Sequence, residues 1–152
     1  MAELEFDHLV LRYCRQIILK TMNHVRSVMR GENRLSIKRA VANPLLQKSA
    51  QNLTKAVDRD AENLILDALQ HKFTKLPGVK ANTVFSEELG IKIFPEGASE
   101  SEANLVAFIN PIDGMEFIES LQGGWSLIAV YDRRADEVIA AVAGDIFLDR
   151  IY

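Results

Sequence analysis

The chain has 152 residues, a length typical of one domain, and a chain of this size can bury about 68–70% of its unfolded surface. With 48% hydrophobic and 26% charged residues, the composition excludes general disorder. The net charge of -3 gives no electrostatic case for nucleic-acid binding, and no apolar run approaches the ~20 residues needed to cross a bilayer.

Two long amphipathic helices are predicted. Apolar residues recur at intervals of three and four positions over residues 6–29, which predicts one helix that ends at Gly31. The single cysteine, Cys14, lies in this stretch and is expected to be a buried, small hydrophobic side chain rather than a nucleophile. A second apolar stripe over residues 57–69 predicts another helix, stopped by the Leu-Pro-Gly sequence at 76–78.

The strand signals follow in the second half of the chain. Residues 83–85 read as a short strand, 95–104 as an exposed loop and 105–109 as a strand buried on both faces. Residues 125–131 and 138–143 flank a charged turn and predict a hairpin, in which Arg133 and Arg134 should be solvated. Because helices come first and strands later, we expect an α+β layer fold.

The two ends of the chain carry further expectations. Residues 1–7 are acidic and lack the layout of a signal peptide, so we expect a cytoplasmic protein. Residues 145–152 have strand character and then stop without a terminating signal. An apolar strand left at a sheet edge promotes association, so we expect a truncated chain and a homodimer.

Three acidic clusters lie near the predicted ends of these elements. Asp58 and Glu62 are one helical turn apart, Glu87 and Glu88 directly follow a strand, and Asp113 follows the buried strand. Any one cluster alone, such as Glu87 and Glu88, is better explained by a solvated loop. Together they favour a site for a hard cation, because Mg²⁺ prefers several oxygen ligands.

The order of these segments resembles the inositol monophosphatase superfamily, which also contains fructose bisphosphatases and nucleotide 3'-phosphatases. The matching segments are 54–62, Ser86-Glu87-Glu88 and 110–114, and the likeness covers about residues 45–152. The resemblance implies that residues 1–152 are the N-terminal metal-binding α+β domain of the sugar-phosphatase fold, with two long helices packed on a mainly antiparallel sheet. The C-terminal domain, which supplies a further metal-binding Asp, would be absent.

The family's chemistry implies a metal site at these positions. Mg²⁺ ions would bind the phosphate of a small phosphorylated metabolite and activate a water molecule for attack on phosphorus. Glu88 would bind the first metal with help from the backbone carbonyl of Ile112, and Asp113 would bind the second. The carboxylate that bridges the two metals in the family falls on Asn110.

The remaining roles concern the water and the phosphate. Asp58 would pair with a hydroxyl group to orient the water, and that hydroxyl position falls on Met115. Glu87 would support the metal ligands as a further catalytic residue. The backbone N–H groups of Gly114 and Met115 would bind the phosphate if they open a helix.

Asn110 and Met115 depart from the family pattern and leave two hypotheses open. Two dications ~4 Å apart repel by about 16 kcal/mol at an effective dielectric constant of ~20, and an amide brings no charge to offset this. Methionine cannot donate a hydrogen bond to a water. The chain is therefore expected to be either a Mg²⁺-dependent phosphomonoesterase or a catalytically weakened relative that binds a phosphate ligand or has a structural role.

Overall fold

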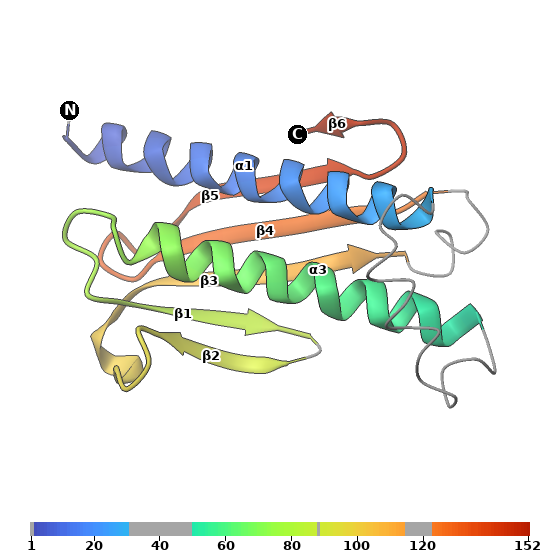
Figure 1. Cartoon of the computed structure of the whole chain (residues 1–152). Helices are drawn as coiled ribbons and strands as arrows, with labels where there is room; N and C mark the ends of the chain where they lie inside the picture. Colours follow the sequence, from blue (N-terminus) through green and yellow to red (C-terminus); the bar gives the residue numbers. More distant parts are fainter. Residues whose placement is uncertain (1, 31–49, 88, 115–122) are drawn as a thin grey trace.

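The computed structural model describes residues 2–30, 50–87, 89–114 and 123–152, which form two long helices on one face of a sheet (Figure 1). The helices are α1 (Ala2–Met29) and α3 (Ala50–Phe73), with a short 3-10 helix η2 (Glu100–Glu102). The strands are β1 (Ala81–Ser86), β2 (Gly90–Phe94), β3 (Ala103–Asp113), β4 (Trp125–Asp132), β5 (Glu137–Asp145) and β6 (Arg150–Ile151). This arrangement confirms the predicted α+β fold.

The sheet is antiparallel except at one pair of strands. The strand order is β2-β1-β3-β4-β5-β6, and only β1 and β3 pair in parallel, with Ser86 opposite Ile109. The carboxyl ends of parallel strands meet at the same edge of a sheet, where ligands bind in many α/β proteins. The parallel pair therefore brings together the two segments that follow β1 and β3.

The core lies between the two helices and the sheet. The largest fully buried side chains include Ile17, Ile18, Met22, Ile65, Leu69, Phe73, Leu105 and Ile128. Helix α1 packs closely on β5 at Gly144. A Cβ atom at Gly144 would lie 2.3 Å from the Sδ atom of Met22 and 2.5 Å from the Cγ2 atom of Ile18. Only glycine permits this contact without a shift of α1.

Both predicted helices and the four predicted strand segments are confirmed, with longer bounds. Helix α3 begins at Ala50, seven residues before the predicted apolar stripe. The prediction began too late because the sequence of residues 50–56 has few apolar residues in a periodic pattern. Gly31, the predicted end of the first helix, lies outside the described residues. Strand β2 was not predicted, and the expected loop at 95–104 contains η2 and the start of β3.

Arg133 and Arg134 are exposed in the hairpin turn, as predicted, whereas the prediction about the chain end is wrong. Both arginines also have partners that were not predicted: Arg133 donates to the Glu100 carbonyl oxygen at 2.9 Å, and Arg134 forms a salt bridge of 2.6 Å with Asp132. Residues 145–152 do not form one strand. The carboxylate of Asp145 accepts backbone hydrogen bonds from residues 147 and 148, which closes a turn before the short strand β6.

The charge of Asp132 is stabilised in this hairpin. Burial alone would raise the pKa of Asp132, but the hydrogen bonds and the positive charge of Arg134 hold that pKa below its ordinary value. The Arg134 guanidinium also lies over the ring of Phe6, 5.4 Å from its centroid, which connects the hairpin to α1. A buried carboxylate with an arginine partner stabilises the fold only while it is ionised.

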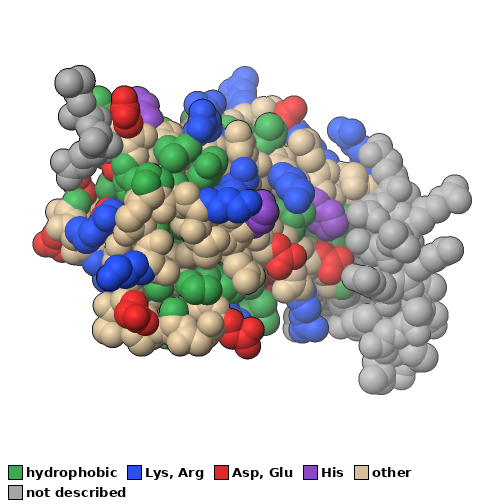
Figure 2. Space-filling view, turned by 60° about the vertical axis from the view of Figure 1, so that its left-hand side comes forward, with side chains coloured by type: hydrophobic (Ala, Val, Ile, Leu, Met, Phe, Trp, Pro, Cys, Tyr) green, Lys and Arg blue, Asp and Glu red, His purple; other side chains and the backbone are tan. Residues whose placement is uncertain are grey.

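The described surface has mixed charge. On the face in Figure 2, Lys and Arg side chains lie among Asp and Glu side chains, so the described residues on that face produce no field of a single sign. Neither described helix is long and apolar enough to cross a membrane.

Candidate active site

The candidate site lies at the edge of the sheet where β1 and β3 end. The N-terminal end of α3 lies at the same end of the molecule (Figure 1). The parallel register places Ser86 opposite Ile109, so Glu87 and Asn110 follow at the same level of the sheet. This shared edge brings together two of the three acidic segments found in the sequence.

Glu62 attaches α3 to the end of β1. Its side chain is fully buried, and its Oε1 atom accepts a hydrogen bond from the Ser86 hydroxyl and another, of 3.1 Å, from the Leu89 backbone N–H. A buried carboxylate requires such donors. Glu62 therefore fixes the turn that carries Glu87, and Asp58 lies half-buried one helical turn earlier on α3.

Glu62 was predicted to belong to an acidic cluster, without a role of its own. A signal for its burial was present, because Ile65 and Leu66 lie three and four residues later on the same helical face. Both are buried in the structure. An acidic residue on an apolar helical face needs a partner, and this requirement points to a structural anchor rather than to a solvated position.

The end of β3 is irregular at the predicted metal-binding segment. Asn110 pairs with Leu127 and Asp113 pairs with Trp125. Between these two pairs β3 advances by three residues and β4 by only two, so β3 contains one extra residue, a β-bulge. Such bulges change the direction of a side chain and are frequent beside active sites. Gly114 follows with a φ of 78°, a conformation that glycine adopts without strain.

The structure separates the predicted site residues by environment. Glu87 and Asp113 are exposed, Asn110 is half-buried, and the side chain of Ile112 is buried. Glu87 and Asn110 line one groove of about 670 Å³ on the sheet face opposite the helices, whereas Asp58 lies on α3. Glu88 and Met115 lie outside the described residues.

The donor set at this edge suits a hard cation. Glu87, Asn110 and Asp113 offer carboxylate or amide oxygens, which are ligands that Mg²⁺ prefers. The described part of the chain contains no group of three His, Cys, Asp or Glu residues placed to hold a metal ion. Glu88, the predicted ligand of the first metal, lies outside that part.

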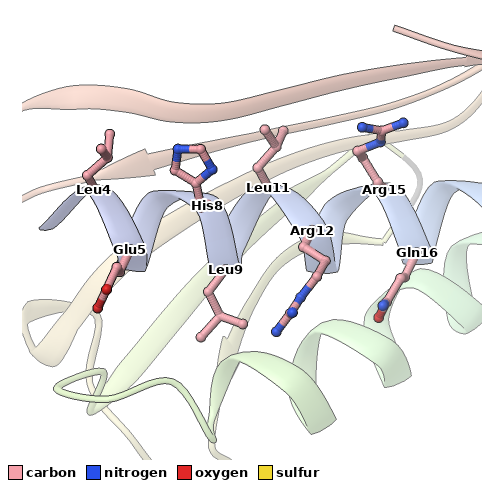
Figure 3. A pocket seen from close by; sticks show the side chains of 8 residues that line it. All are labelled: Leu4, Glu5, His8, Leu9, Leu11, Arg12, Arg15 and Gln16. Atoms are coloured by element: carbon pink, nitrogen blue, oxygen red, sulfur yellow. The ribbon is translucent and has the colours of Figure 1, made fainter. Parts of the chain in front are cut away.

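A second hollow, of about 950 Å³, runs along α1 (Figure 3). Leu4, His8, Leu11 and Arg15 point to one side of the helix, and Glu5, Leu9, Arg12 and Gln16 point to the other. None of the predicted site residues lines this hollow. All of its lining residues come from α1 and none from a second element, so it is not a convergent set of polar groups, and we place the candidate active site at the end of β1 and β3.

Comparison with known protein families identifies the family to which this chain belongs. The profile of the inositol monophosphatase family matches residues 8–152. The chain belongs to the inositol monophosphatase family. No curated protein sequence matches it.

Two solved structures are similar to this inositol monophosphatase family member. Inositol monophosphatase II from Staphylococcus aureus MSSA476 has 17% identity and a TM-score of 0.64 over 94% of this chain. A structure of SaIMPase-II bound to inositol monophosphate has 19% identity and a TM-score of 0.60, also over 94% of this chain. At these identities the likeness establishes the fold. The chain spans 45% and 42% of the lengths of those two proteins.

Proposed function

We propose that this chain supplies the metal-binding part of a Mg²⁺-dependent phosphomonoesterase that hydrolyses a small sugar phosphate or inositol phosphate. Membership of the inositol monophosphatase family supports phosphatase chemistry. The observation that carries the proposal is the parallel pairing of β1 and β3, through which the segments that carry Glu87, Asn110 and Asp113 end at one edge of the sheet, while Glu62 accepts a hydrogen bond from the Leu89 N–H in the turn after β1. The inositol monophosphate bound to SaIMPase-II supports a phosphorylated small molecule as the ligand.

Each role at the proposed metal site follows from the chemistry of a side chain or carbonyl. Glu88, Asp113 and the backbone carbonyl of Ile112 would hold Mg²⁺, with the Asn110 amide oxygen as a neutral donor. Bound Mg²⁺ supplies Lewis acidity that polarises a phosphoryl oxygen and lowers the pKa of a coordinated water. Asp113 is exposed at the end of β3, so a substrate phosphate can approach it from solvent.

Asp58, Glu87 and Gly114 would act on the water and the phosphate. A carboxylate at Asp58 accepts a hydrogen bond from a water and orients it, and Glu87 adds negative charge beside the metal ligands. The backbone N–H groups of Gly114 and Met115 would bind a phosphate oxygen, and the φ of 78° at Gly114 ends the extended conformation of β3. Met115 cannot share in orienting the water, since a thioether is only a weak acceptor.

Asn110 favours the second hypothesis, a weakened relative that binds phosphate without efficient turnover. It is half-buried in the groove at the position where the family has a bridging carboxylate. A neutral amide does not offset the repulsion between two dications, so one metal should bind better than two. The location of the protein in the cytoplasm and its assembly as a homodimer stay predictions, as does the treatment of residues 1–152 as one metal-binding domain.

The phosphatase proposal is tested by phosphate release in the presence and absence of Mg²⁺. The protein is the longest reading frame that contains residues 1–152, and the substrates are inositol monophosphate, fructose bisphosphate and an aryl phosphate. We expect Asn110→Asp to raise the rate and Met115→Thr to act only beside it, because a water is oriented usefully only when both metals are bound. A group acting in the transition state typically contributes a factor of ~10²–10⁴.

The two hypotheses give different results in this assay. Wild-type protein with a rate close to that of its Asn110→Asp variant would exclude the weakened relative. A double variant Asn110→Asp, Met115→Thr that binds Mg²⁺ but hydrolyses none of the three substrates would exclude the phosphatase.

A further inference from the structure

Strand β5 has a second partner strand along only part of its length. One side of β5 pairs with β4, whereas on the other side β6 pairs with residues 144 and 145. A reciprocal pair of backbone hydrogen bonds between Ala143 and Tyr152 ends this contact. In the part of the chain that the structure describes, residues 137–142 have no partner strand on that side. Because an antiparallel ladder alternates, the N–H and C=O of Ala141 point to the same open side as those of Ala143.

This free edge carries little that would prevent pairing with another chain. Residues 138–144 read Val-Ile-Ala-Ala-Val-Ala-Gly, without a charge or a proline. Edge strands of soluble proteins commonly carry Lys, Pro or a bulge, which discourages such pairing. The register of β5 shifts between the Val130–Ala140 and Tyr131–Val138 pairs, so its bulge lies at the start of the strand. From Ala140 onward the edge is regular and open to an added strand.

A row of side chains on α1 runs beside this edge. Residues 4, 8, 11, 15, 18 and 22 are three or four positions apart and therefore share one face of the helix. The first four members point to one side of α1 in Figure 3. The last two, Ile18 and Met22, lie against Gly144 of β5. The row therefore faces β5.

The burial of this row changes along its length. Ile18 and Met22, beside the part of β5 that pairs with β6, are fully buried. Leu4 is 63% exposed, and His8 and Arg15 are exposed as well. The row is thus covered where β5 has two partner strands and uncovered towards the N-terminus of α1.

Helix α1 and strand β5 run in the same direction, as Figure 1 shows. The ring of Phe6 lies under the guanidinium of Arg134, in the turn before β5, and Met22 lies against Gly144 near the end of β5. The exposed part of the row therefore lies beside the part of β5 that has no second partner strand.

We propose that the free edge of β5 and the exposed row of α1 bind an extended acidic segment of another protein, which pairs with β5 as an added antiparallel strand. In strand addition, main-chain hydrogen bonds provide affinity and alternate side chains provide specificity. Running in the direction of β6, the added strand would exchange hydrogen bonds with Ala141. Its side chains opposite Ala140 and Val142 would point towards α1, because these two residues are buried on the helix side of the sheet.

The side chains of the row select the residues of the segment. A helix rises ~1.5 Å and a strand ~3.4 Å per residue, so Arg15 comes level with about Val142, and Leu11 with about Ala140. An acidic residue opposite Val142 would therefore meet a guanidinium, and an apolar residue two positions later would meet Leu11. Exposed His8 comes level with about Val138 and suits a second acidic residue.

The charge of α1 favours an acidic segment over a basic one. Residues 8–31 contain five Lys or Arg residues and no Asp or Glu: Arg12, Arg15, Lys20, Arg26 and Arg30. Opposite charges across an interface speed encounter and suppress partners of the wrong sign. The proposal uses none of the residues assigned to the metal site, so it stands or falls apart from the phosphatase chemistry.

The first test uses isotope-labelled protein of residues 1–152 and the synthetic peptide Thr-Glu-Thr-Val-Thr-Glu-Thr with blocked ends. Its first glutamate would lie opposite Val142 and its valine opposite Ala140. We expect a saturable shift of the Ala141 amide signal in nuclear magnetic resonance spectra, together with slower hydrogen exchange of that amide. A peptide with lysine in place of both glutamates should bind at least about tenfold more weakly.

N-methylated peptides separate strand pairing from charge attraction. The third residue of the peptide would donate its N–H to the Ala141 carbonyl oxygen, whereas the N–H of the fourth residue would point to solvent. We expect methylation of the third nitrogen to weaken binding at least about tenfold and methylation of the fourth to change it less than about twofold.

Two protein variants test the row on α1. Arg15→Glu should weaken binding of the glutamate peptide at least about tenfold, because a carboxylate would then face a carboxylate. Lys20→Glu is the matched control, since Lys20 is exposed on the same helix but projects about 140° away from Arg15 around its axis. Circular dichroism checks that each variant is folded.

Four results would overturn the proposal. They are absence of binding by the glutamate peptide, equal binding of the two N-methylated peptides, and equal weakening by Arg15→Glu and Lys20→Glu. The fourth is exchange of the Ala141 amide that slows as the protein concentration rises without peptide, as expected if the edge pairs with a second copy of the chain.

Discussion

Gly144→Ala tests the packing of α1 on β5. The added Cβ would lie 2.3 Å from Met22 Sδ and 2.5 Å from Ile18 Cγ2, where carbon contacts are normally ~3.5–4.0 Å. Met22 is flexible and can move part of the way, but Ile18 is β-branched and fully buried, so α1 itself must shift. Overpacking of this kind costs about 1–3 kcal/mol, and we expect ~2 kcal/mol, equivalent to a fall in Tm of about 4–8 °C.

The assay is thermal and urea unfolding followed by circular dichroism. Gly123→Ala is the control, because a Cβ there meets nothing within 4 Å and the backbone is not in the left-handed region. Met22→Ala should partly rescue Gly144→Ala, so the double variant should lose less stability than the sum of the two single variants. Equal stability of the Gly144→Ala and Gly123→Ala proteins would refute the close approach of α1 to β5.

Three further predictions concern single side chains. Glu62→Gln should lower the free energy of unfolding by about 1–2 kcal/mol, since the Ser86 and Leu89 donors lose a charged acceptor; an unchanged urea midpoint would contradict this. The pKa of Asp132 is lowered in the folded protein, so its ionised form stabilises the fold above the ordinary pKa near ~4, and this stabilisation is lost as the pH falls through the lower folded pKa. In Arg134→Ala the loss of unfolding free energy between about pH 5 and 2 should therefore be smaller than in the wild type. Burial raises the pKa of the Cys14 thiol to about 12, so iodoacetamide should modify it only in denaturant, and rapid labelling of native protein would show that α1 is misplaced.

The helices could be predicted from sequence because their signal is local. Apolar spacing alone located α1 and most of α3, and continuous apolar runs located the cores of β3 and β4. Strand β2 was missed because it is an edge strand whose side chains are half-buried or exposed, so its burial pattern gives no clean alternation.

The segments of the candidate site could be proposed from the sequence, but the residues that support them could not. The motif order suggested Glu87, Asn110 and Asp113, whose role stays a prediction, and the parallel pairing of β1 and β3 brings their segments to one edge of the sheet. That pairing is a long-range contact, which no local pattern encodes. The contacts of Glu62 across 24 and 27 residues were missed for the same reason.

The hairpin and the exposure of its arginines were predicted, but the ion-pair partners of those arginines were not. The turn between β4 and β5 was located correctly, but Arg133 has its partner in η2, 33 residues earlier in the chain. Charged turns are usually solvated, and only the three-dimensional arrangement places Glu100 within reach. Sequence spacing can therefore propose a turn without identifying the residues that its charges bind.

The magnesium site is tested most directly by calorimetric titration of Mg²⁺ into the wild-type protein and three variants. We predict that the wild type binds Mg²⁺ weakly and that Asp113→Asn abolishes this binding. Asp67→Asn, the control at an exposed position of α3, should bind as the wild type does. Asn110→Asp should bind at least about tenfold more tightly, because a carboxylate replaces a neutral amide. Mg²⁺ binding that is the same in Asp113→Asn as in wild type, or the same in Asn110→Asp as in wild type, would contradict a metal site at the end of β3.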